Sequence, residues 1–385
     1  MWEIALIILA VLGAAFWVVA LPVWFFGIRS MRHLEEAGRE YGLERYPRLS
    51  VIVPARDEAR GIEAAMQSLL AQDYPDLEIV AVDDRSADGT AGILDRLAAE
   101  HPALRVLRVS ELPEGWFGKN HAMKRGYEVS TGEWLLFTDA DIEFAPECLR
   151  YAVGYAAGAG RDHLTLVPEI VTGGPLIRGL ISAFHMLFSL FSRPWAASNP
   201  DSRAYVGVGA FNLVRREAYE AVGTHHRIPL RPDDDLKLAK LMKRSGFRQE
   251  CLFALDLVKV EWYANIGEAI KGMEKSVFAG MDYRVGPIVA SGLLLFVTNV
   301  FPFIGVFLAA GVARALFALS LLLLLVVYLY HTRLTGTPAY YVLLHPVSAS
   351  FFIYITLHST YRALNGGVRW RGTTYPLETL KKNRV

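Results

Sequence analysis

Cysteine is scarce and net charge is almost absent in this chain of 385 residues. The two cysteines, Cys148 and Cys251, are too few for a disulfide framework or a zinc cluster, and they fit a reducing compartment. The 40 basic and 39 acidic residues leave a formal charge of +1, so we expect no nucleic-acid partner. No Gly-x-Gly-x-x-Gly sequence follows the first predicted strand, which disfavours a nicotinamide enzyme.

Charge is missing altogether from Ile4–Phe26, a stretch long enough to cross a bilayer as a helix. We therefore expect an N-terminal transmembrane anchor over residues 1–28. A signal peptide would begin with basic residues and have a shorter apolar core, whereas this chain begins with Met, Trp and Glu. Arg29, Arg32 and Arg39 follow the anchor, so the positive-inside rule predicts that the next part faces the cytosol.

Apolar stretches return late in the chain, at Pro287–Ala310, Ala315–Tyr330 and Pro338–Leu357. They predict a C-terminal transmembrane region over residues 285–362, with two to three spans, followed by a basic tail over residues 363–385. One anchor and three late spans would leave the tail outside, whereas its basic residues favour the inside. A re-entrant or interfacial late segment would reconcile the two. A further apolar stretch, Leu176–Trp195, fits a buried core helix or an in-plane helix at the membrane surface equally well.

Between these apolar regions, residues 48–283 have the pattern of one α/β domain. Short β-branched runs alternate with helical spacing, which predicts an open, mostly parallel sheet. The predicted strands are Arg48–Ala55, Leu77–Asp84, Leu104–Val109 and Glu133–Asp141, and the first helices are Glu63–Leu70 and Ala91–Glu100. Acidic residues stand at the ends of three strands, where such sheets bind their ligands. They are Asp57, Glu58, Asp83, Asp84, Asp139 and Asp141.

The sequence Thr-Asp-Ala-Asp at residues 138–141 carries the strongest local signal. Along an extended chain, residues two apart point to the same side, so Asp139 and Asp141 can converge. Two carboxylates that close repel each other unless a cation lies between them. Mg²⁺ or Mn²⁺ takes oxygen ligands, commonly one or two carboxylates together with substrate phosphates. The pair therefore predicts half of a divalent-metal site, with an acidic edge turn as the alternative.

Other candidate residues have ordinary structural explanations beside the functional ones. Glu58 could be a helix-start acid that favours the helix dipole, and Lys119 could be a solvated surface lysine rather than a phosphate contact. Asp234 and Asp235 open a helical pattern, where acids are again common dipole partners. A functional interpretation requires one of these two to abstract a proton, and the local pattern does not choose between the explanations.

Taken in order, the motifs resemble those of inverting family-2 glycosyltransferases with the nucleotide-diphospho-sugar transferase (GT-A) fold. They are VIVPARDE, VDDRSADGT, GKNHAMKRG, TDAD, GVGAFNLVRREAYEAVG and DDDLKLAKLMKRSG, over about Leu49–Tyr283. EGWFGKNHA, KGMEKSVFAG and VRWRGTTY are most similar to the membrane-bound lipid glycosyltransferases of hopanoid-associated, carotenoid and ceramide types. The resemblance implies a hexosyltransferase of the bacterial cytoplasmic membrane. It would move a sugar from a UDP- or GDP-sugar to a lipid hydroxyl with the help of Mg²⁺ or Mn²⁺.

The resemblance also assigns a role to each matching residue. Asp139 and Asp141 would hold the metal, Lys119 would contact the nucleotide, and Gly209 would border the donor sugar and the acceptor. Asp235 would be the general base, and Asp234 replaces the glutamate that usually precedes it. The remaining residues would line the nucleoside pocket: Pro54, Glu58, Asp83 and Asp84.

One departure from the family's sequence pattern limits the kinds of product that we expect. Polymer synthases carry Gln-x-x-Arg-Trp before their late spans, whereas the matching region Glu261–Lys275 lacks it. A polysaccharide synthase is therefore the less expected alternative. A polyisoprenyl-phosphate sugar synthase needs basic residues near its acceptor, and Arg178, Arg193 and Arg203 are available. The late spans carry almost no charge, which disfavours a transporter.

Overall fold

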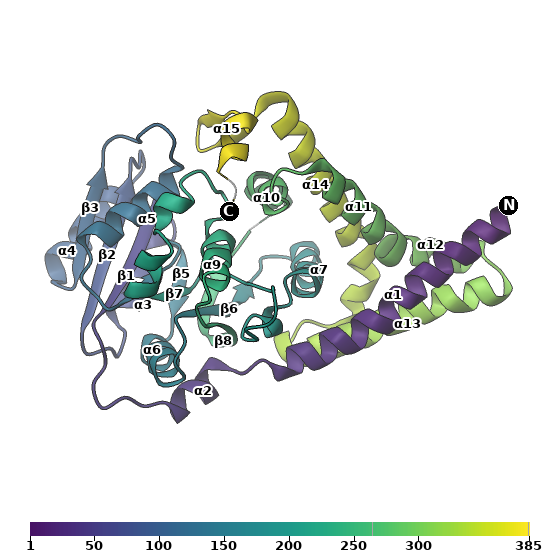
Figure 1. Ribbon diagram of the computed structural model, residues 1–385, viewed down its shortest axis with the longest axis horizontal. Helices are drawn as coiled ribbons and strands as arrows, with labels where there is room; N and C mark the ends of the chain where they lie inside the picture. Colours follow the sequence, from purple (N-terminus) through teal and green to yellow (C-terminus); the bar gives the residue numbers. More distant parts are fainter. Residues whose placement is uncertain (264, 384) are drawn as a thin grey trace. The chain divides into compact units, whose positions relative to one another are not determined.

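The computed structural model describes residues 1–263, 265–383 and 385 (Figure 1). Two compact units make up this part of the chain. The α/β unit consists of Ser30–Val171, Pro194–Trp262 and Lys382–Val385, and the helical unit consists of Met1–Arg29, Thr172–Arg193 and Tyr263–Lys381. The chain therefore passes between the two units five times. Residue 384, an arginine counted in the predicted basic tail, lies outside the described residues, as does residue 264 in the predicted α/β domain.

An eight-stranded sheet forms the centre of the α/β unit, in the order β3-β2-β1-β4-β7-β6-β8-β5. The β1–β2, β2–β3, β1–β4 and β6–β8 pairs are parallel, and the β4–β7, β6–β7 and β5–β8 pairs are antiparallel. The predicted mostly parallel sheet is confirmed. The strands are β1 Leu49–Ala55, β2 Leu77–Asp84, β3 Leu104–Val109, β4 Trp134–Phe137, β5 Ile142–Phe144, β6 His163–Val171, β7 Asn212–Arg215 and β8 Gln249–Glu261.

Strand β1 is apolar along its length because both of its faces are covered, as is usual for a central parallel strand. Val51 and Val53 face one hydrophobic cluster, which also contains Ile62 and Leu69 of a neighbouring helix. Ile52 faces a second cluster on the opposite side. The helices of this unit are α2 Leu34–Glu40, α3 Ile62–Leu70, α4 Thr90–Glu100, α5 Gly118–Val129, α6 Cys148–Gly158, α8 Arg216–Ala221 and α9 Asp234–Arg244, with short 3₁₀ turns at Pro194–Ala196 and His225–Arg227.

The strand predicted to end in two aspartates is shorter than the sequence suggested. β4 stops at Phe137, where its pairing with β1 ends, and the chain then turns to reach β5 at the other edge of the sheet. The Thr138 hydroxyl donates to the Ala210 carbonyl at 2.7 Å and fixes the start of this turn. Asp139 and Asp141 therefore lie in the connection between two strands rather than on an extended strand, so the alternation rule does not govern their directions.

The helical unit contains the long apolar helices. Its elements are α1 Trp2–Ser30, α7 Pro175–Ser192, α10 Ile266–Gly280, α11 Val285–Leu295, a π-helical turn Phe296–Val300, α12 Phe301–Leu308, α13 Gly311–Thr335, a 3₁₀ turn Ala339–Leu344, α14 His345–Gly366, the hairpin β9 Val368–Trp370 and β10 Thr373–Tyr375, and α15 Leu377–Lys382. In the part of the chain that the structure describes, five helical stretches are long and apolar enough to cross a membrane. They include the predicted anchor and all three predicted late segments.

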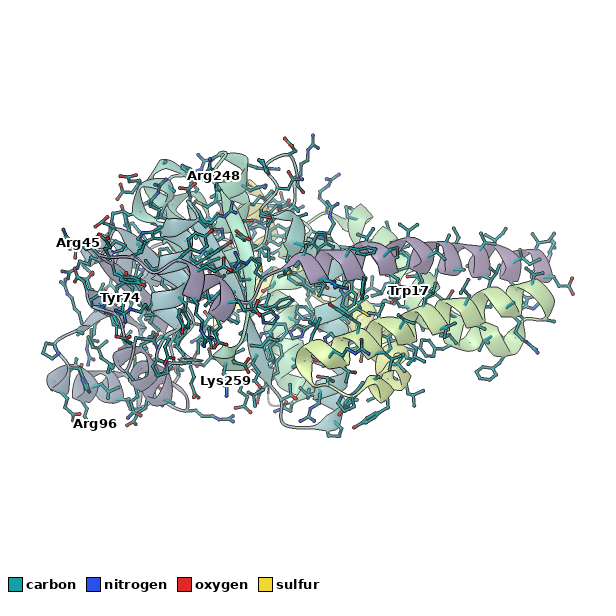
Figure 2. All side chains as sticks on the ribbon, turned by 90° about the horizontal axis from the view of Figure 1, so that it is seen from below. Trp17, Arg45, Tyr74, Arg96, Arg248 and Lys259 are labelled. Carbon is teal, nitrogen blue, oxygen red and sulfur yellow. The ribbon has the colours of Figure 1, made fainter. Side chains whose placement is uncertain are left out.

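α1 and α13 lie side by side, with Leu6 and Ala10 packed against Ala313 and Phe317 (Figure 1). Trp17, labelled in Figure 2, is buried and donates through Nε1 to the Thr298 carbonyl at 2.9 Å. Many other apolar side chains of α1 project outward and are exposed, among them Ile8, Val19 and Phe26 (Figure 2). Exposed apolar surface of this extent on a helix fits contact with lipid.

A chain of polar groups crosses the interior of the helical unit. Asn299 of the π-helical turn lies 2.9 Å from the Nε2 atom of His345, whose Nδ1 atom lies 2.9 Å from the Tyr328 hydroxyl. The Asn299 amide also donates to the Thr298 hydroxyl at 2.7 Å. Asn299, His345 and Tyr328 come from different helical stretches. Their hydrogen bonds therefore hold the late helices together, where apolar packing alone has little directional preference.

Two segments of the predicted α/β domain group with the apolar helices instead. α7 packs against α14 and the turn that precedes it, and α10 packs against α14. α7 is thus not a core helix of the α/β unit, and the boundaries 48–283 remain a prediction. The reason is visible in α7 itself, whose 18 residues carry one charged side chain, Arg178.

Candidate active site

The turns that follow β1 and β2 are joined by hydrogen bonds at the carboxyl ends of these two strands. The Asp57 carboxylate accepts from the Ala87 amide at 2.7 Å, and the Asp57 amide donates to the Ser86 hydroxyl at 3.1 Å. The Glu58 amide donates to the Thr90 hydroxyl at 2.8 Å. Asp57 adopts a left-handed φ of 56°, an uncommon and strained conformation for a residue with a side chain. Asp57 thus has a structural role, and the turn places the predicted site residue Glu58 beside the loop that follows β2.

Asp84 is buried at the end of β2 and forms a bidentate ion pair with its neighbour. Arg85 donates from Nε at 2.8 Å and from Nη2 at 3.1 Å, and the Arg56 guanidinium lies 3.9 Å away. The adjacent Asp83 accepts from the Ser86 amide at 3.2 Å. Asp83 and Asp84, two of the acids predicted to line the nucleoside pocket, are therefore held by the loop after β2. The charge of Asp84 is balanced in the ligand-free chain.

Gly118, the first residue of α5, lies directly against Asp84. A Cβ atom added at Gly118 would be 2.2 Å from the Asp84 Oδ2 atom and 3.1 Å from the Arg85 Nη2 atom. No side chain fits there unless the ion pair moves. The close approach joins the end of β2 to the start of α5, where the predicted phosphate contact Lys119 follows.

Replacing Gly118 with alanine is expected to lower the affinity for a nucleotide sugar by about tenfold or more, since the methyl group must displace the Asp84–Arg85 pair. Gly92 in α4 is a matched control, because an added Cβ meets nothing within 4 Å. The Gly92→Ala chain should bind normally and gain about 0.5–1 kcal/mol of stability. Equal binding by the two variants, measured by calorimetry, would contradict this assignment of the Asp84 region.

Lys119 joins three segments that are far apart in the sequence. Its Nζ atom lies 2.7 Å from the Asp139 Oδ1 atom and 3.6 Å from the Asp234 Oδ2 atom. Asp139 belongs to the β4–β5 connection, and Asp234 is the first residue of α9. The structure therefore brings the predicted metal-binding, nucleotide-binding and catalytic residues into one cluster, which we call the carboxylate cluster: Glu58, Lys119, Asp139, Asp141, Asp234 and Asp235.

Two glycines allow the segment before β7 to run through this cluster. A Cβ atom at Gly209 would be 2.8 Å from the Asp139 Oδ2 atom, and one at Gly207 would be 2.1 Å from the Asp235 carbonyl oxygen. Backbone therefore packs directly against both aspartates. The predicted border position of Gly209 is consistent with this packing.

Charge in the carboxylate cluster is unevenly balanced. Burial alone would lower the pKa of Lys119, but the carboxylates of Asp139, Asp234 and Asp235 outweigh it and raise that pKa well above its usual range. Surrounding protein atoms and then the nearby Asp139 and Glu58 raise the pKa of Asp141 to about 7. The Asp141 residue is nevertheless exposed to water, so the effect of burial on its pKa is smaller than for an enclosed carboxyl group. One ammonium among five carboxylates leaves an excess of negative charge that favours another cation.

Asp235 has a pKa suited to proton transfer near neutral pH. Burial and the neighbouring Asp234 raise the pKa of Asp235 to about 7, and Lys119 opposes the shift. The Asp235 Oδ1 atom accepts from the Leu236 amide at 2.8 Å, which orients the carboxylate. A general base is most effective when its pKa lies close to the working pH.

A divalent cation fits the carboxylate cluster only with help from a ligand. Asp139 and Asp141 offer hard carboxylate oxygens, and repulsion between them is already expressed in the raised pKa of Asp141. Among the residues that the structure describes, no group of three or more His, Cys, Asp or Glu side chains is placed to hold a metal. Two carboxylates and a bound diphosphate would complete the coordination that Mg²⁺ or Mn²⁺ requires.

The sequence did not predict a buried ionic group beside Asp234 and Asp235. Arg231 donates to Asp233 from Nε at 2.8 Å and from Nη2 at 2.9 Å, and the Lys237 Nζ atom lies 3.4 Å from the same carboxylate. All three side chains are at most 3% exposed. They anchor the start of α9, which carries Asp234 and Asp235. The spacing i, i+2 and i+6 in Arg-Pro-Asp-Asp-Asp-Leu-Lys contains this group, but nothing local distinguishes it from a solvated helix start.

A family model described as "Glycosyl transferase family 2" matches residues 50–223, from β1 through α8. The match includes Lys119, Asp139, Asp141 and Gly209, and it ends before Asp234 and Asp235. The chain carries a family-2 glycosyltransferase domain. The predicted family is confirmed for this part of the chain.

A solved structure and two curated proteins are similar to this chain, and the solved structure agrees with the fold. A mannosyltransferase from Pyrobaculum calidifontis, solved in complex with GDP-mannose and Mn²⁺, matches 91% of this chain and 99% of its own, with a TM-score of 0.59 and 21% identity. A 4,4'-diaponeurosporenoate glycosyltransferase of Staphylococcus aureus is 24% identical over 178 residues, which is 46% of each chain. An uncharacterised glycosyltransferase of Escherichia coli is 34% identical over 99 residues, 26% of this chain and 27% of that protein. The chain thus spans about half or less of the length of these curated relatives.

Proposed function

We propose that this protein transfers a hexose from a UDP- or GDP-sugar to a hydroxyl group of a membrane lipid, with inversion at the anomeric carbon. The observation that supports it most is the position of Lys119, which joins Asp139 and Asp234 within one cluster. A group that can bind a diphosphate, groups that can bind a metal and a group that can accept a proton therefore lie close together. They lie near the carboxyl ends of the strands, where open α/β sheets bind their ligands.

The nucleoside would be bound at the ends of β1 and β2 by Pro54, Glu58, Asp83 and Asp84. Both acids that end β2 are fixed by the following loop, so this side of the site is preorganised. Lys119 would contact the diphosphate, since a lysine ammonium is a common phosphate ligand. Asp139 and Asp141 would hold a divalent cation, which when bound offsets the charge that develops on the leaving diphosphate. Mn²⁺ in the mannosyltransferase of similar fold supports this proposal.

Asp235 would act as the general base. Its carboxylate would take the proton of the acceptor hydroxyl while the hydroxyl oxygen bonds to the anomeric carbon and the bond from that carbon to the diphosphate breaks. A single displacement of this kind inverts the anomeric configuration. Asp234 would stay paired with Lys119, and the buried Arg231–Asp233–Lys237 group would keep the start of α9 in place.

A lipid acceptor is supported by the composition of the helical unit. Its five apolar stretches would hold the protein in the bacterial cytoplasmic membrane, and Arg29, Arg32 and Arg39 favour a cytosolic α/β unit. One stretch, α7, interrupts the family-2 glycosyltransferase domain itself. A chain that combines apolar helices with this domain could bind a water-soluble donor and a membrane-bound acceptor at the same time. The carotenoid-acid glycosyltransferase among its relatives also favours a lipid over a polymer.

The order of segments in the two units limits the number of membrane crossings. Val171 and Pro194, on either side of α7, both belong to the α/β unit, so α7 would enter and leave the membrane on one side. Trp262 and Lys382 also belong to the α/β unit, so an even number of the three late stretches would cross. With α1, three crossings result. The remaining late stretch would be re-entrant or interfacial, and the basic tail would lie in the cytosol.

This topology predicts that green fluorescent protein fused after Val385 is fluorescent, because it folds on the cytosolic side. Alkaline phosphatase fused at the same place should be inactive, since it requires the periplasm. As a control, both reporters placed before Met1 should give the opposite pattern, because α1 crosses once. An active phosphatase after Val385 would mean that three late stretches cross and would refute the proposed topology.

The proposed function is tested with the full chain purified in lipid nanodiscs. It is incubated with Mn²⁺, a bacterial lipid extract and a panel of radiolabelled UDP- and GDP-sugars, and the extracted products are identified by mass spectrometry. A sugar joined to a lipid hydroxyl with inverted configuration supports the proposal. A sugar joined to an isoprenyl phosphate, or a polymer, would replace it with one of the two alternative activities.

A further inference from the structure

The loop Arg227–Arg231 leads directly into the residues before α9. The first turn of α5 holds this loop from one side. The Phe117 amide donates to the Pro229 carbonyl at 2.8 Å. The Asn120 side-chain amide donates to the carbonyls of Ile228 at 2.6 Å and Arg231 at 2.9 Å. Lys119 lies in the same turn, so the loop and the carboxylate cluster share one support.

The far end of the chain holds the same loop through Asn383. Its Oδ1 atom accepts from the Leu230 amide at 3.1 Å, and its Nδ2 atom donates to the Arg227 carbonyl at 3.2 Å. One carboxamide thus satisfies a donor and an acceptor of the loop backbone. The two groups are three residues apart, and the bonds cross more than 150 positions of sequence.

Val385 adds an apolar contact on α9. It packs against the hydrophobic cluster that contains Leu238 and Met242 of α9 together with Ile228 of the loop. The C mark in Figure 1 lies close to α9, in agreement with this contact. Residues Lys382–Val385 are accordingly part of the α/β unit, although the preceding helix α15 begins in the helical unit.

We propose that Asn383 and Val385 support the catalytic apparatus and that Asn383 is a positioning residue for Asp234 and Asp235. This inference rests on the proposed function. Asn120 and Asn383 grip the loop from two sides, and the loop runs through Arg231 into the buried group at the start of α9. The reacting groups of an enzyme must be held within a fraction of an ångström, so loosening one side of this grip slows the reaction even though no ligand contact is lost.

Only a carboxamide can make both Asn383 bonds. Aspartate keeps the acceptor for the Leu230 amide but has no donor for the Arg227 carbonyl, and alanine has neither. We expect kcat to fall about tenfold in Asn383→Ala and less in Asn383→Asp, while KM for the nucleotide sugar changes less than about twofold. Lys382→Ala is the matched control, because it shortens a neighbouring side chain and leaves both Asn383 bonds intact.

The test uses the full chain in nanodiscs with two independent readouts. The first is the kcat and KM series. The second is hydrogen–deuterium exchange of the peptide covering residues 227–235, which should be faster in Asn383→Ala and unchanged in Lys382→Ala. Exchange is measured without any substrate, so it remains informative if the lipid acceptor is not the one proposed.

The inference is overturned by unchanged exchange and unchanged kcat in Asn383→Ala. It is equally overturned if Lys382→Ala has the same effect, or if the variant loses kcat only because its melting temperature falls and its donor KM rises. Failure of every donor and acceptor pair to give product would refute the proposed function, whereas faster exchange at residues 227–235 would still support the grip on the loop.

Discussion

Replacing Asp235 with asparagine should lower kcat by about 10²–10⁴-fold, the range that a positioned general base contributes. Asparagine has nearly the same shape and can still accept from the Leu236 amide, so the geometry of the α9 start should survive. It cannot take a proton from the acceptor hydroxyl. Donor binding, measured by calorimetry with a nucleotide sugar, should remain within about threefold of the wild-type value.

Stability provides a second diagnostic for the same variant. Asp235 lies beside Asp234, and their repulsion contributes to the raised pKa of Asp235. Removing one of the two charges should therefore leave the melting temperature of the ligand-free protein equal or higher. Asp256→Asn on the exposed side of β8 serves as the control and should change neither property. Undiminished turnover in Asp235→Asn would eliminate Asp235 as the base, and a lower melting temperature would assign it a structural role.

Replacing Asp141 with asparagine should weaken Mn²⁺ binding in the presence of nucleotide by at least about 100-fold. Replacing a residue that only orients a metal ligand already lowers metal affinity by about 10–100-fold, and this substitution removes the charge of a ligand itself. Activity at micromolar Mn²⁺ should disappear and return in part at millimolar Mn²⁺. Titration by calorimetry with the nucleotide present checks the result, and Glu143→Gln on β5 is a nearby exposed control. Unchanged Mn²⁺ titration in Asp141→Asn would refute the metal assignment.

The same carboxylates predict how the stability of the metal-free protein depends on pH. The pKa values of Asp141 and Asp235 are both raised to about 7, above the usual value near 4 of an unfolded carboxyl group. Between these values the folded state holds protons that the unfolded state has released. Stability should therefore fall as pH rises from about 4 to about 7 and stay low above it. Asp141→Asn should flatten this decline, and Mn²⁺ with nucleotide should stabilise the wild type at pH 8 more than at pH 5.

The local sequence pattern predicted the strands and helices whose position and length depend on residues close by in the sequence. Strands β1, β2 and β3 begin and end within a residue of expectation, because β-branched runs are bounded there by turn residues. The long apolar helices were predicted because a membrane span requires a minimum length. Asp139, Lys119 and Asp234 were selected as site residues, and the structure brings them together.

Features decided by distant contacts were not predicted. β4 ends at Phe137, where its pairing with β1 stops, and this end depends on a strand about 80 residues earlier. Asn383 resembles any polar residue near the end of a chain until its contacts with Arg227 and Leu230 are known. Arg231 and Lys237 look like ordinary surface cations beside acids, although both are buried. In each case the determining partner is remote in sequence and therefore leaves no periodic signal.

The position of α7 has a practical consequence for anyone preparing a soluble fragment. A fragment of residues 48–262 would retain all eight strands of the sheet together with Asp139 and Asp235. It would also retain Pro175–Ser192, an apolar helix that packs with α14 in the full chain and would lose that partner. Exposed to water, such a helix promotes aggregation. We therefore expect a fragment that contains α7 to need detergent or lipid, and cutting away the terminal helices should not remove this need.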